Sequence, residues 1–266
     1  PISVLHGVRD VDMAEAQASR ARPTLNTVEQ VKRWKQAGGG RCDVMVDTGM
    51  NRLGLAAKDV LDGLLDGLSI DTLLSHLASA DEDVPQNERQ RAAFAALAGR
   101  TNATRMSLAN SAGICLGPDY HFDLTRPGLA LYGGIPRGEA VGHIMQVAHP
   151  QAQVIQRRRI KAGDSVGYNA TFTADRDMEL AILNIGYADG YLRGFSNRGS
   201  AGGGRFPVVG RVSMDLLAIC VDAEPDLGEG DWVALDYALA EATAQSGLSQ
   251  YELLTTLGSR FDRTWA

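Results

Sequence analysis

Two halves of the chain differ in the way hydrophobic and polar positions alternate. In residues 1–142, short apolar runs alternate with amphipathic segments, and this order predicts strands at 42–46, 70–77 and 105–109. Helices are predicted at 58–68 and 87–97, and an earlier helix is predicted to start at Asn26 and end at the glycines 38–40. Strands that alternate with helices pair in parallel, so this half is predicted to be an α/β domain.

From residue 143 onward the apolar runs become shorter, and turns rich in Gly, Asp and Asn separate them. Strands are predicted at 154–160, 179–185, 207–209, 216–221 and 232–235. A final helix is predicted after Ser249, because Ser249 and Glu252 have the spacing of a capping box. The chain is therefore predicted to contain an α/β domain, residues 1–142, followed by a mostly antiparallel β domain, residues 143–266.

Composition and charge narrow the class of protein. The chain has 266 residues, a hydrophobic content of 44% and a net charge of −6, which argues against a nucleic-acid or anionic-membrane partner. No apolar run approaches the roughly 20 residues that span a bilayer. Cys42, Cys115 and Cys220 are widely scattered, and the histidines lack ligand spacing. We therefore expect no metal site and a reducing, cytoplasmic location.

Polar clusters follow the ends of successive predicted strands. They are Asp47–Gly54, Ser75–His76, Asn110–Gly113 and Arg126–Leu129. The carboxyl ends of parallel strands are where α/β barrels place their sites. Ser111 opens a short predicted helix, whose free backbone amides would favour an anion. The pattern alone therefore indicates an anion-binding α/β enzyme.

Each of these residues, taken singly, has a commoner explanation. Arg52 would be a surface arginine, His76 a hydrogen-bonded structural histidine and Ser111 a helix cap. Tyr168 and Tyr187 would be half-buried aromatic residues of strands. Only the combination of clusters at the same ends of successive strands favours a functional site.

The same motifs resemble those of the alanine racemases, which are fold-type III pyridoxal-phosphate enzymes. Eight motifs occur in the order of that family: DTGMNRLG, SHLASADE, LANSAGI, RPGLALYG, VGYNATF, IGYADGY, GRVSMD and QYELL. The resemblance implies a (β/α)₈ TIM-type barrel followed by a β domain, and a homodimer with shared active sites. It also implies interconversion of L- and D-alanine by two-base (Tyr/Lys) proton transfer on a pyridoxal-phosphate Schiff base, supplying D-alanine for peptidoglycan.

The resemblance assigns five residues to the cofactor. Ser111 and Tyr251 would bind its phosphate, together with backbone groups of Gly128 and Leu129. Arg126 would donate to the pyridine nitrogen. Because an arginine does not give up its proton, the ring would stay neutral and act as a weaker electron sink. That arrangement would disfavour transamination as a side reaction.

The resemblance assigns five further residues to catalysis and substrate binding. His76 would lie between the cofactor's arginine and the partner's Tyr168. Tyr168 would be one of the two catalytic bases, and Arg52 would hold the substrate carboxylate and tune Tyr168. Met214 would supply a backbone donor from the partner, and Tyr187 would line the substrate entrance. Two bases on opposite faces of the substrate Cα are what racemisation requires.

The chain departs from the family at two places. The family's cofactor lysine lies in a stretch like VKANAYGHG at the end of the first barrel strand, and nothing here matches it. Residues 1–5 look like the third barrel strand, so we expect the first two βα units to be absent and the chain to be a fragment. Met45 stands where many relatives have a lysine that supports the arginine equivalent to Arg52. The four lysines are expected to be solvated: Lys32, Lys35, Lys58 and Lys161.

Two alternatives follow from the same residues. The first is a truncated or non-catalytic racemase-like protein that dimerises and binds phosphate. The second is a racemase of broader specificity, acting on serine or basic amino acids, and the surroundings of Tyr187 would decide this. Fold-type III decarboxylases fit less well, because they place a carboxylate near the pyridine nitrogen where this chain has Arg126.

Overall fold

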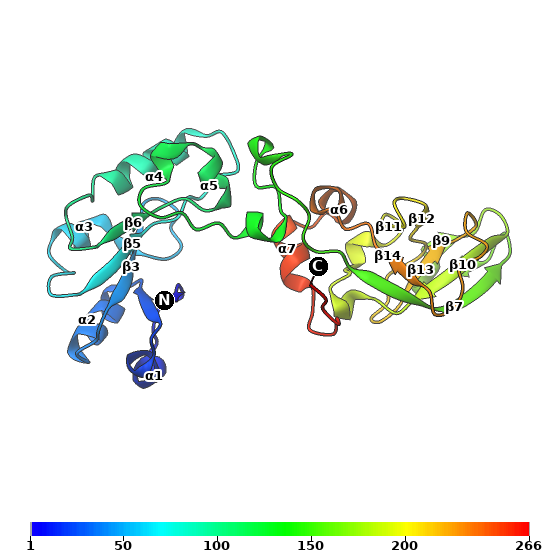
Figure 1. Ribbon diagram of the computed structural model, residues 1–266, viewed down its shortest axis with the longest axis horizontal. Coiled ribbons are helices and arrows are strands. Elements are labelled where there is room, and N and C mark those ends of the chain that lie inside the picture. Colours follow the sequence, from blue (N-terminus) through cyan, green and yellow to red (C-terminus); the bar gives the residue numbers. More distant parts are fainter. Residues whose placement is uncertain (1, 266) are drawn as a thin grey trace. The chain divides into compact units, whose positions relative to one another are not determined.

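The computed structural model describes residues 2–265, so Pro1 and Ala266, at the outer ends of the two predicted domains, lie outside it. The chain forms two compact units (Figure 1). The first runs to Gly128 and includes Pro136–Val141. The second comprises Leu129–Ile135 and the chain from Gly142 onward. The segment around residues 129–141 therefore contributes to both units.

The first unit is built on a parallel sheet. Its strands lie in the order β1, β2, β3, β5, β6, and β4 pairs with β3. Every pair is parallel, as predicted, and a further parallel bridge joins Asn110 to Arg126. The strands are β1 (Ser3–Val4), β2 (Arg22–Leu25), β3 (Cys42–Asp47), β4 (Leu55–Ala56), β5 (Ile70–Leu74) and β6 (Arg105–Ser107).

Helices connect these strands. On α2, Val31 and Trp34 are buried while the lysines between and beside them face water, which is the amphipathic pattern of a helix packed on a sheet. The helical elements are η1 (Asp10–Asp12), α1 (Met13–Ala18), α2 (Val28–Gln36), α3 (Ala57–Leu61), α4 (Pro85–Ala95), α5 (Ser111–Cys115), η2 (Pro118–Tyr120) and η4 (Gly138–Ala140).

Two helix boundaries predicted in this unit are wrong. The N-cap of α2 is Thr27, whose Oγ1 accepts a hydrogen bond from the Gln30 amide, and not Asn26. The side-chain amide of Asn26 donates to the carbonyls of Leu5 and Thr24. Its Oδ1, the atom that would cap a helix, accepts no hydrogen bond within residues 2–265. The helix predicted at 58–68 ends at Leu61, because turns that include two glycines with positive φ follow it.

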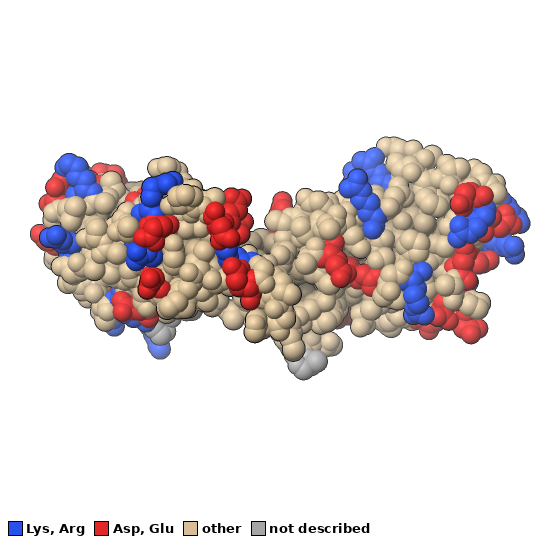
Figure 2. Space-filling model, turned by 90° about the horizontal axis from the view of Figure 1, so that it is seen from above, with Lys and Arg blue, Asp and Glu red and all other residues tan. Residues whose placement is uncertain are grey.

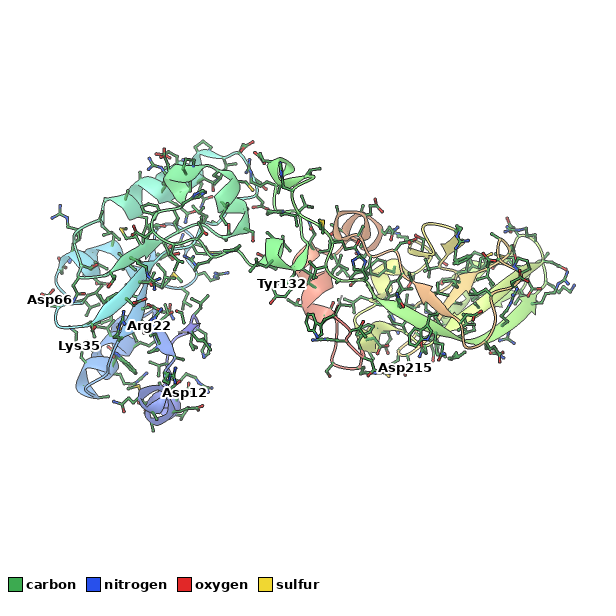
Figure 3. All side chains as sticks on the ribbon, viewed as in Figure 1. Asp12, Arg22, Lys35, Asp66, Tyr132 and Asp215 are labelled. Atoms are coloured by element: carbon green, nitrogen blue, oxygen red, sulfur yellow. The ribbon has the colours of Figure 1, made fainter. Side chains whose placement is uncertain are left out.

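The two faces of the parallel sheet differ in polarity. The apolar core packs alternate strand residues such as Val44 and Leu73 against the helices. Side chains from five neighbouring strands form a polar network instead, and Arg22 (Figure 3) lies within it, with Nε 3.2 Å from Asp43 and Nη2 2.9 Å from Asp71. Asp43 also accepts a hydrogen bond from Ser3 Oγ, and Arg105 pairs with Asp71. Both aspartates are buried, so this network ties the strands together in one register.

The second unit is built on antiparallel strands. Its main sheet has the order β13, β10, β7, β14, and two hairpins, β8–β9 and β11–β12, lie beside it. The strands are β7 (Gln151–Ile160), β8 (Ser165–Val166), β9 (Phe172–Thr173), β10 (Met178–Leu183), β11 (Ser200–Ala201), β12 (Phe206–Pro207), β13 (Leu217–Cys220) and β14 (Trp232–Ala234).

Short helices complete the second unit. Ser249 caps α7 as predicted: its Oγ accepts from the Glu252 amide, and the Glu252 carboxylate accepts from the Ser249 amide. A helix before it, α6, was not predicted. The helical elements are η3 (Leu129–Tyr132), η5 (Tyr168–Ala170), η6 (Tyr187–Asp189), η7 (Arg193–Phe195), α6 (Leu239–Ser246) and α7 (Gln250–Thr256).

Acidic and basic side chains are interleaved on the face drawn in Figure 2. Such mixing fits the modest net charge and differs from the continuous basic surface of a nucleic-acid-binding protein. Within residues 2–265, no helix combines the length and the apolar character needed to cross a membrane.

Candidate functional site

Arg126 and His76 form the centre of the polar cluster in the first unit. Arg126 Nη1 donates to Ser107 Oγ over 2.5 Å, and Nη2 donates to the Ser75 carbonyl over 2.6 Å. Nη2 also lies 3.4 Å from Nδ1 of His76, which accepts because a guanidinium can only donate. Burial lowers the pKa of Arg126 to about 10, so it remains a cation at neutral pH.

His76 is held in its neutral form. Burial, the charge of Arg126 and then the charge of Arg52 lower the pKa of His76 to about 4. With Nδ1 accepting from Arg126, the proton of the neutral ring is on Nε2, which is then available to donate to a further group. The backbone at His76 is fixed by buried Gln90, whose Nε2 donates to the His76 carbonyl over 3.0 Å.

Arg52 projects from a loop that the carboxylate of Asp47 organises. Asp47 accepts hydrogen bonds from the amides of Gly49, Met50 and Arg52, over 2.7, 2.9 and 3.2 Å. Burial alone would raise the pKa of Asp47, but these amide hydrogen bonds outweigh it and lower the pKa. Gly54 has φ of +136°, and a Cβ there would lie 2.5 Å from the Asp47 amide nitrogen, so the loop requires glycine.

The environment of Arg52 differs from that implied for relatives with a supporting lysine. Met45 is buried on β3 and offers neither charge nor hydrogen bond. Within residues 2–265, the guanidinium of Arg52 forms no salt bridge, and its side chain is exposed. The sequence left open which group replaces the supporting lysine beside Arg52. Within residues 2–265, no side chain takes that place by a salt bridge to its guanidinium.

A hydrogen bond joins Ser111, at the start of α5, to the backbone of Gly128. Ser111 is the first residue of α5 and is buried, and its Oγ accepts from the Gly128 amide over 2.9 Å. Asn110, not Ser111, is the N-cap: its side-chain oxygen accepts from the Gly113 amide. The simple explanation of Ser111 as a helix cap is therefore wrong.

Tyr168 and Met214 are on exposed turns of the second unit. Tyr168 opens η5 and is 64% exposed, so it is not a half-buried strand aromatic. Met214 is 54% exposed. The residues that precede them, Gly167 and Ser213, line one hollow of about 470 Å³ together with Arg211. The turns that carry Tyr168 and Met214 therefore border this hollow, although the two residues are not in its lining.

Tyr187 is joined to the turn that carries Met214. Tyr187 opens η6, and its amide donates to the Ser213 carbonyl over 3.0 Å, while the next amide, of Ala188, donates to the Met214 carbonyl over 2.9 Å. The guanidinium of Arg193 lies 4.8 Å above the Tyr187 ring. Tyr187 is thus on a turn and not, as the simple explanation held, on a strand.

Tyr251 lies in the first turn of α7 and is half exposed. The residue before it, Gln250, exchanges two hydrogen bonds with the backbone of Ile135, over 2.8 and 2.9 Å. These bonds fix the start of α7 beside the segment that begins with Leu129 and η3. Two of the residues expected at the cofactor phosphate, Tyr251 and Leu129, therefore belong to neighbouring elements of the second unit.

All four lysines of the chain are on the surface, as expected. Lys32 pairs with Glu29 at 3.0 Å, and Lys35 donates to the Leu64 carbonyl. The other two pair with aspartates on the surface of their own units: Lys58 with Asp62, and Lys161 with Asp177. Lys58 follows the short strand β4 by two residues, but its amine is engaged by Asp62, and the other three lysines lie away from the carboxyl ends of the parallel strands.

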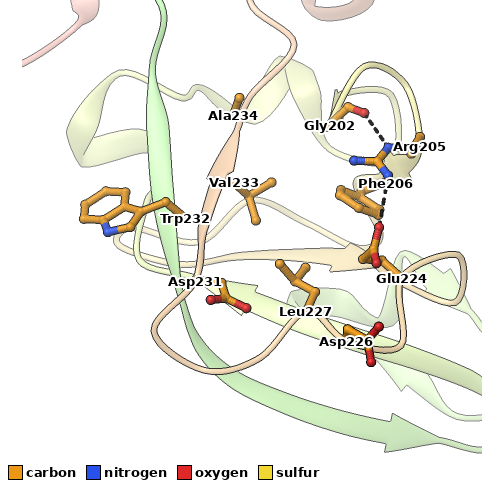
Figure 4. A pocket seen from close by; sticks show the side chains of 10 residues that line it. All are labelled: Gly202, Arg205, Phe206, Glu224, Asp226, Leu227, Asp231, Trp232, Val233 and Ala234. Carbon is orange, nitrogen blue, oxygen red and sulfur yellow. Dashed lines mark hydrogen bonds and ion pairs between the residues drawn. The ribbon is translucent and has the colours of Figure 1, made fainter.

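A second hollow, of about 380 Å³, lies elsewhere in the second unit (Figure 4). Arg205 at its edge pairs with Glu224 at 3.0 Å and lies over the ring of Phe206. Its lining contains none of the residues implicated by the sequence. Among residues 2–265, no group of three or more His, Cys, Asp or Glu side chains has the geometry of a metal site.

Comparison with known families decides the identity of the chain. The model of the alanine racemase N-terminal domain matches residues 1–136, and that of the alanine racemase C-terminal domain matches residues 147–265. The chain belongs to the alanine racemase family. It therefore belongs to a family of isomerases that depend on pyridoxal phosphate and combine a TIM barrel with a β domain.

Individual alanine racemases are similar to this chain over most of their own length. The alanine racemase of Rhodospirillum rubrum is 42% identical, over 98% of this chain and 75% of that protein. The catabolic alanine racemase of Mesorhizobium japonicum is 41% identical, over 98% of this chain and 73% of that protein. The crystal structure of the Bartonella henselae alanine racemase, with covalently bound pyridoxal phosphate, has 34% identity and a TM-score of 0.90, over all of this chain and 79% of that one.

Sequence reasoning missed the residues that hold the site in place. Ser107 and Gln90 are buried polar residues that position Arg126 and His76. The polar cluster that begins at Asp47 was predicted, but not that the Asp47 carboxylate shapes the Arg52 loop. The one sequence signal for such a residue is a polar side chain at a position of a helix or strand where the pattern expects an apolar one. Burial itself, however, becomes known only from the fold.

Proposed function

We propose that this member of the alanine racemase family uses Arg126, His76, Arg52 and Tyr168 in the roles that the family motifs suggest. The observation that carries the proposal is the state of Arg126. It is a cation without a salt-bridge partner among residues 2–265, fixed by carbonyl and hydroxyl acceptors at the ends of the parallel strands. A half-buried cation whose guanidinium meets only neutral acceptors would be stabilised by a further acceptor from a bound molecule, because an unpaired charge with little access to water is costly.

The surroundings of Arg126 fit pyridoxal phosphate except at the point of covalent attachment. Arg126 would donate to the pyridine nitrogen, while Ser111, Tyr251 and the backbone of Gly128 and Leu129 would hold the phosphate. When bound, the cofactor supplies a ring that accepts electron density from the substrate Cα–H bond. The lysine that would attach it is not among the four lysines of this chain, which are paired on the surface.

Proton transfer would be shared between Tyr168 and a lysine from outside these 266 residues. Tyr168 would accept or return the proton on one face of the substrate Cα, and neutral His76 would link it to Arg126. Arg52 would bind the substrate carboxylate, assisted by the Met214 backbone. Because Tyr168 and Met214 lie in the second unit, we propose a homodimer in which each second unit completes the site of the partner.

The biological role would be the supply of D-alanine for peptidoglycan in the cytoplasm. The three free cysteines support a reducing compartment. A catabolic role is the alternative that relatives such as the Mesorhizobium japonicum enzyme support. The proposal names alanine as substrate; acceptance of larger amino acids would depend on the space beside Tyr187.

A second candidate function is non-catalytic binding of pyridoxal phosphate or phosphate. The observation that favours it is the surface pairing of all four lysines, which leaves the chain without a group to attach the cofactor. A chain that bound the cofactor only through Arg126 and Ser111 would hold it reversibly. It would also lack one of the two bases that racemisation requires.

One experiment separates the two candidates. The protein is purified as its natural host makes it, its formation of D-alanine from L-alanine is measured, and bound cofactor is fixed by borohydride before peptide mass analysis. Racemisation with the label on a lysine outside the 266 residues supports the proposal. Label on one of the four surface lysines contradicts the assignment of the site. Bound cofactor that stays unattached, without racemisation, supports the second candidate.

A further inference from the structure

A charge cluster that the predicted site does not include joins three segments of the second unit. Arg260 follows α7 and lies between two carboxylates. Its Nε is 3.0 Å from Asp189 Oδ1, and its Nη1 donates to Asp215 Oδ1 over 2.7 Å (Asp215 is labelled in Figure 3). One arginine thus bridges the turn that carries Tyr187, the turn that carries Met214 and the segment that follows the helix of Tyr251.

Asp189 gives the bridge a fixed end. Its carboxylate is buried, and Oδ2 accepts a hydrogen bond from the Gly186 amide over 2.9 Å. Its backbone carbonyl accepts from the Gly258 amide, which brings the C-terminal segment alongside. A buried carboxylate needs a cation nearby, and Arg260 is the residue that pairs with Asp189. The guanidinium is therefore held at this place, even though the arginine side chain is half exposed.

Asp215 is the exposed end of the bridge. It directly follows Met214, and the Ser213 amide closes the turn by donating to the Leu216 carbonyl. The turn lies against the Gly186 backbone, where a Cβ would be 2.4 Å from the carbonyl oxygen of Met214. Two hydrogen bonds from the amides at 187 and 188 complete this contact. The position of the Met214 turn thus depends on close backbone packing against Gly186. The ion pair between Arg260 and Asp215 holds the turn in this place.

We propose that Arg260 is a positioning residue for substrate binding, which it achieves by clamping the Met214 turn to the Tyr187 turn through Asp215 and Asp189. This inference rests on the proposed function, in which Met214 contacts the substrate carboxylate and Tyr187 lines the entrance. Arg260 touches neither reacting atoms nor cofactor. Its loss loosens the two turns that bind substrate and leaves Tyr168 and His76 in place, so substrate binding suffers more than proton transfer.

The test compares Arg260→Gln, Arg260→Lys and the wild-type holoenzyme. Arg263→Gln is the matched control, because Arg263 is in the same segment and, within residues 2–265, its side chain donates to the Gly258 carbonyl and forms no ion pair. We expect Arg260→Gln to raise the KM for L- and D-alanine about tenfold with kcat within about twofold of wild type. Arg260→Lys should recover most of this loss, since a lysine restores the charge.

Hydrogen exchange gives a second readout that needs no activity. The amides of Tyr187 and Ala188 donate across the contact between the two turns, so their exchange should become faster in Arg260→Gln and remain slow in Arg263→Gln. Unchanged KM together with unchanged exchange at these amides overturns the proposal, even if the melting temperature falls. A wild-type enzyme that does not racemise alanine contradicts the proposed function instead, and the exchange comparison still decides whether Arg260 clamps the turns.

Discussion

Protonation of His76 links the stability of the first unit to pH. In the folded protein, burial, Arg126 and Arg52 lower the pKa of His76 to about 4, whereas a histidine in an unfolded chain has a pKa of about 6.5. Between these values the unfolded chain binds more protons than the folded protein. The free energy of unfolding therefore decreases as the pH falls from about 6.5 to about 4, and the contribution of neutral His76 is fully present above that interval.

The interval between the two pKa values gives the size of the effect. At about 1.4 kcal/mol for each pKa unit, the interval from about 4 to about 6.5 corresponds to about 3 kcal/mol. The His76 ring is only partly buried, and solvent reduces the interaction, so we expect about 2 kcal/mol to be lost over the whole interval. A loss of this size is a substantial fraction of the stability of an ordinary domain.

Tryptophan fluorescence during urea unfolding measures this loss in the first unit. Trp34 is 2% exposed in its core, whereas Trp232 and Trp265 of the second unit are 61% and 90% exposed, so emission should change chiefly when the first unit unfolds. The wild type and His76→Gln are compared between about pH 7 and about pH 5. His6→Gln, which removes an exposed histidine of the same unit, is the matched control.

The variant should lose part of the pH dependence, whatever its stability at neutral pH. The wild type and His6→Gln should lose stability together as the pH falls, while His76→Gln should show a smaller decrease. The carboxylate of Asp47, whose pKa is lowered, acts mainly below this pH range and does not obscure the comparison. Equal pH dependence in the wild type and His76→Gln would refute the reasoning.

Three further predictions concern the site and the core. Tyr168→Phe should slow proton exchange at Cα of one alanine enantiomer by about 10²- to 10⁴-fold and of the other far less, measured by deuterium incorporation; equal losses would contradict the two-base assignment. Arg126→Glu should increase transamination as a side reaction, seen as formation of pyruvate from alanine, and no increase would contradict the electron-sink argument. Asp71→Asn should lower the free energy of unfolding of the first unit by about 3 kcal/mol, because it leaves Arg105 without its carboxylate partner and Arg22 with Asp43 alone. The exposed aspartate variant Asp62→Asn should cost less than about 1 kcal/mol, and a similar loss in both would show that burial of the network is unimportant.

The sequence by itself determined the two kinds of sheet and the positions of their main strands. Alternation of apolar runs with amphipathic segments predicted the parallel strands β3, β5 and β6, and short apolar runs between turns predicted the antiparallel strands. The capping box at Ser249 located α7 to the residue. These features depend on periodicity and on hydrogen bonds between residues three or four positions apart, and such local information is contained in the sequence.

The tertiary structure decided which polar residues act together. Asn26 has the sequence signal of a helix cap, yet its side-chain amide donates to the distant Leu5 carbonyl and its Oδ1 accepts from no helix amide within residues 2–265. Thr27 caps α2 in its place. Arg126 and His76 are 50 positions apart, and only the pairing of strands brings them within 3.4 Å. The motifs of the family indicated that both residues are important. They did not indicate the burial that keeps His76 neutral.

The supporting residues were visible only in three dimensions. Arg260, Asp189 and Asp215 come from three separate segments, and no spacing in the sequence connects them. The same holds for the network around Asp71, whose partners come from other strands and from the end of a helix connection. A charge is recognised as part of a site or a core by its partners and its distance from water, and both are set when the chain folds.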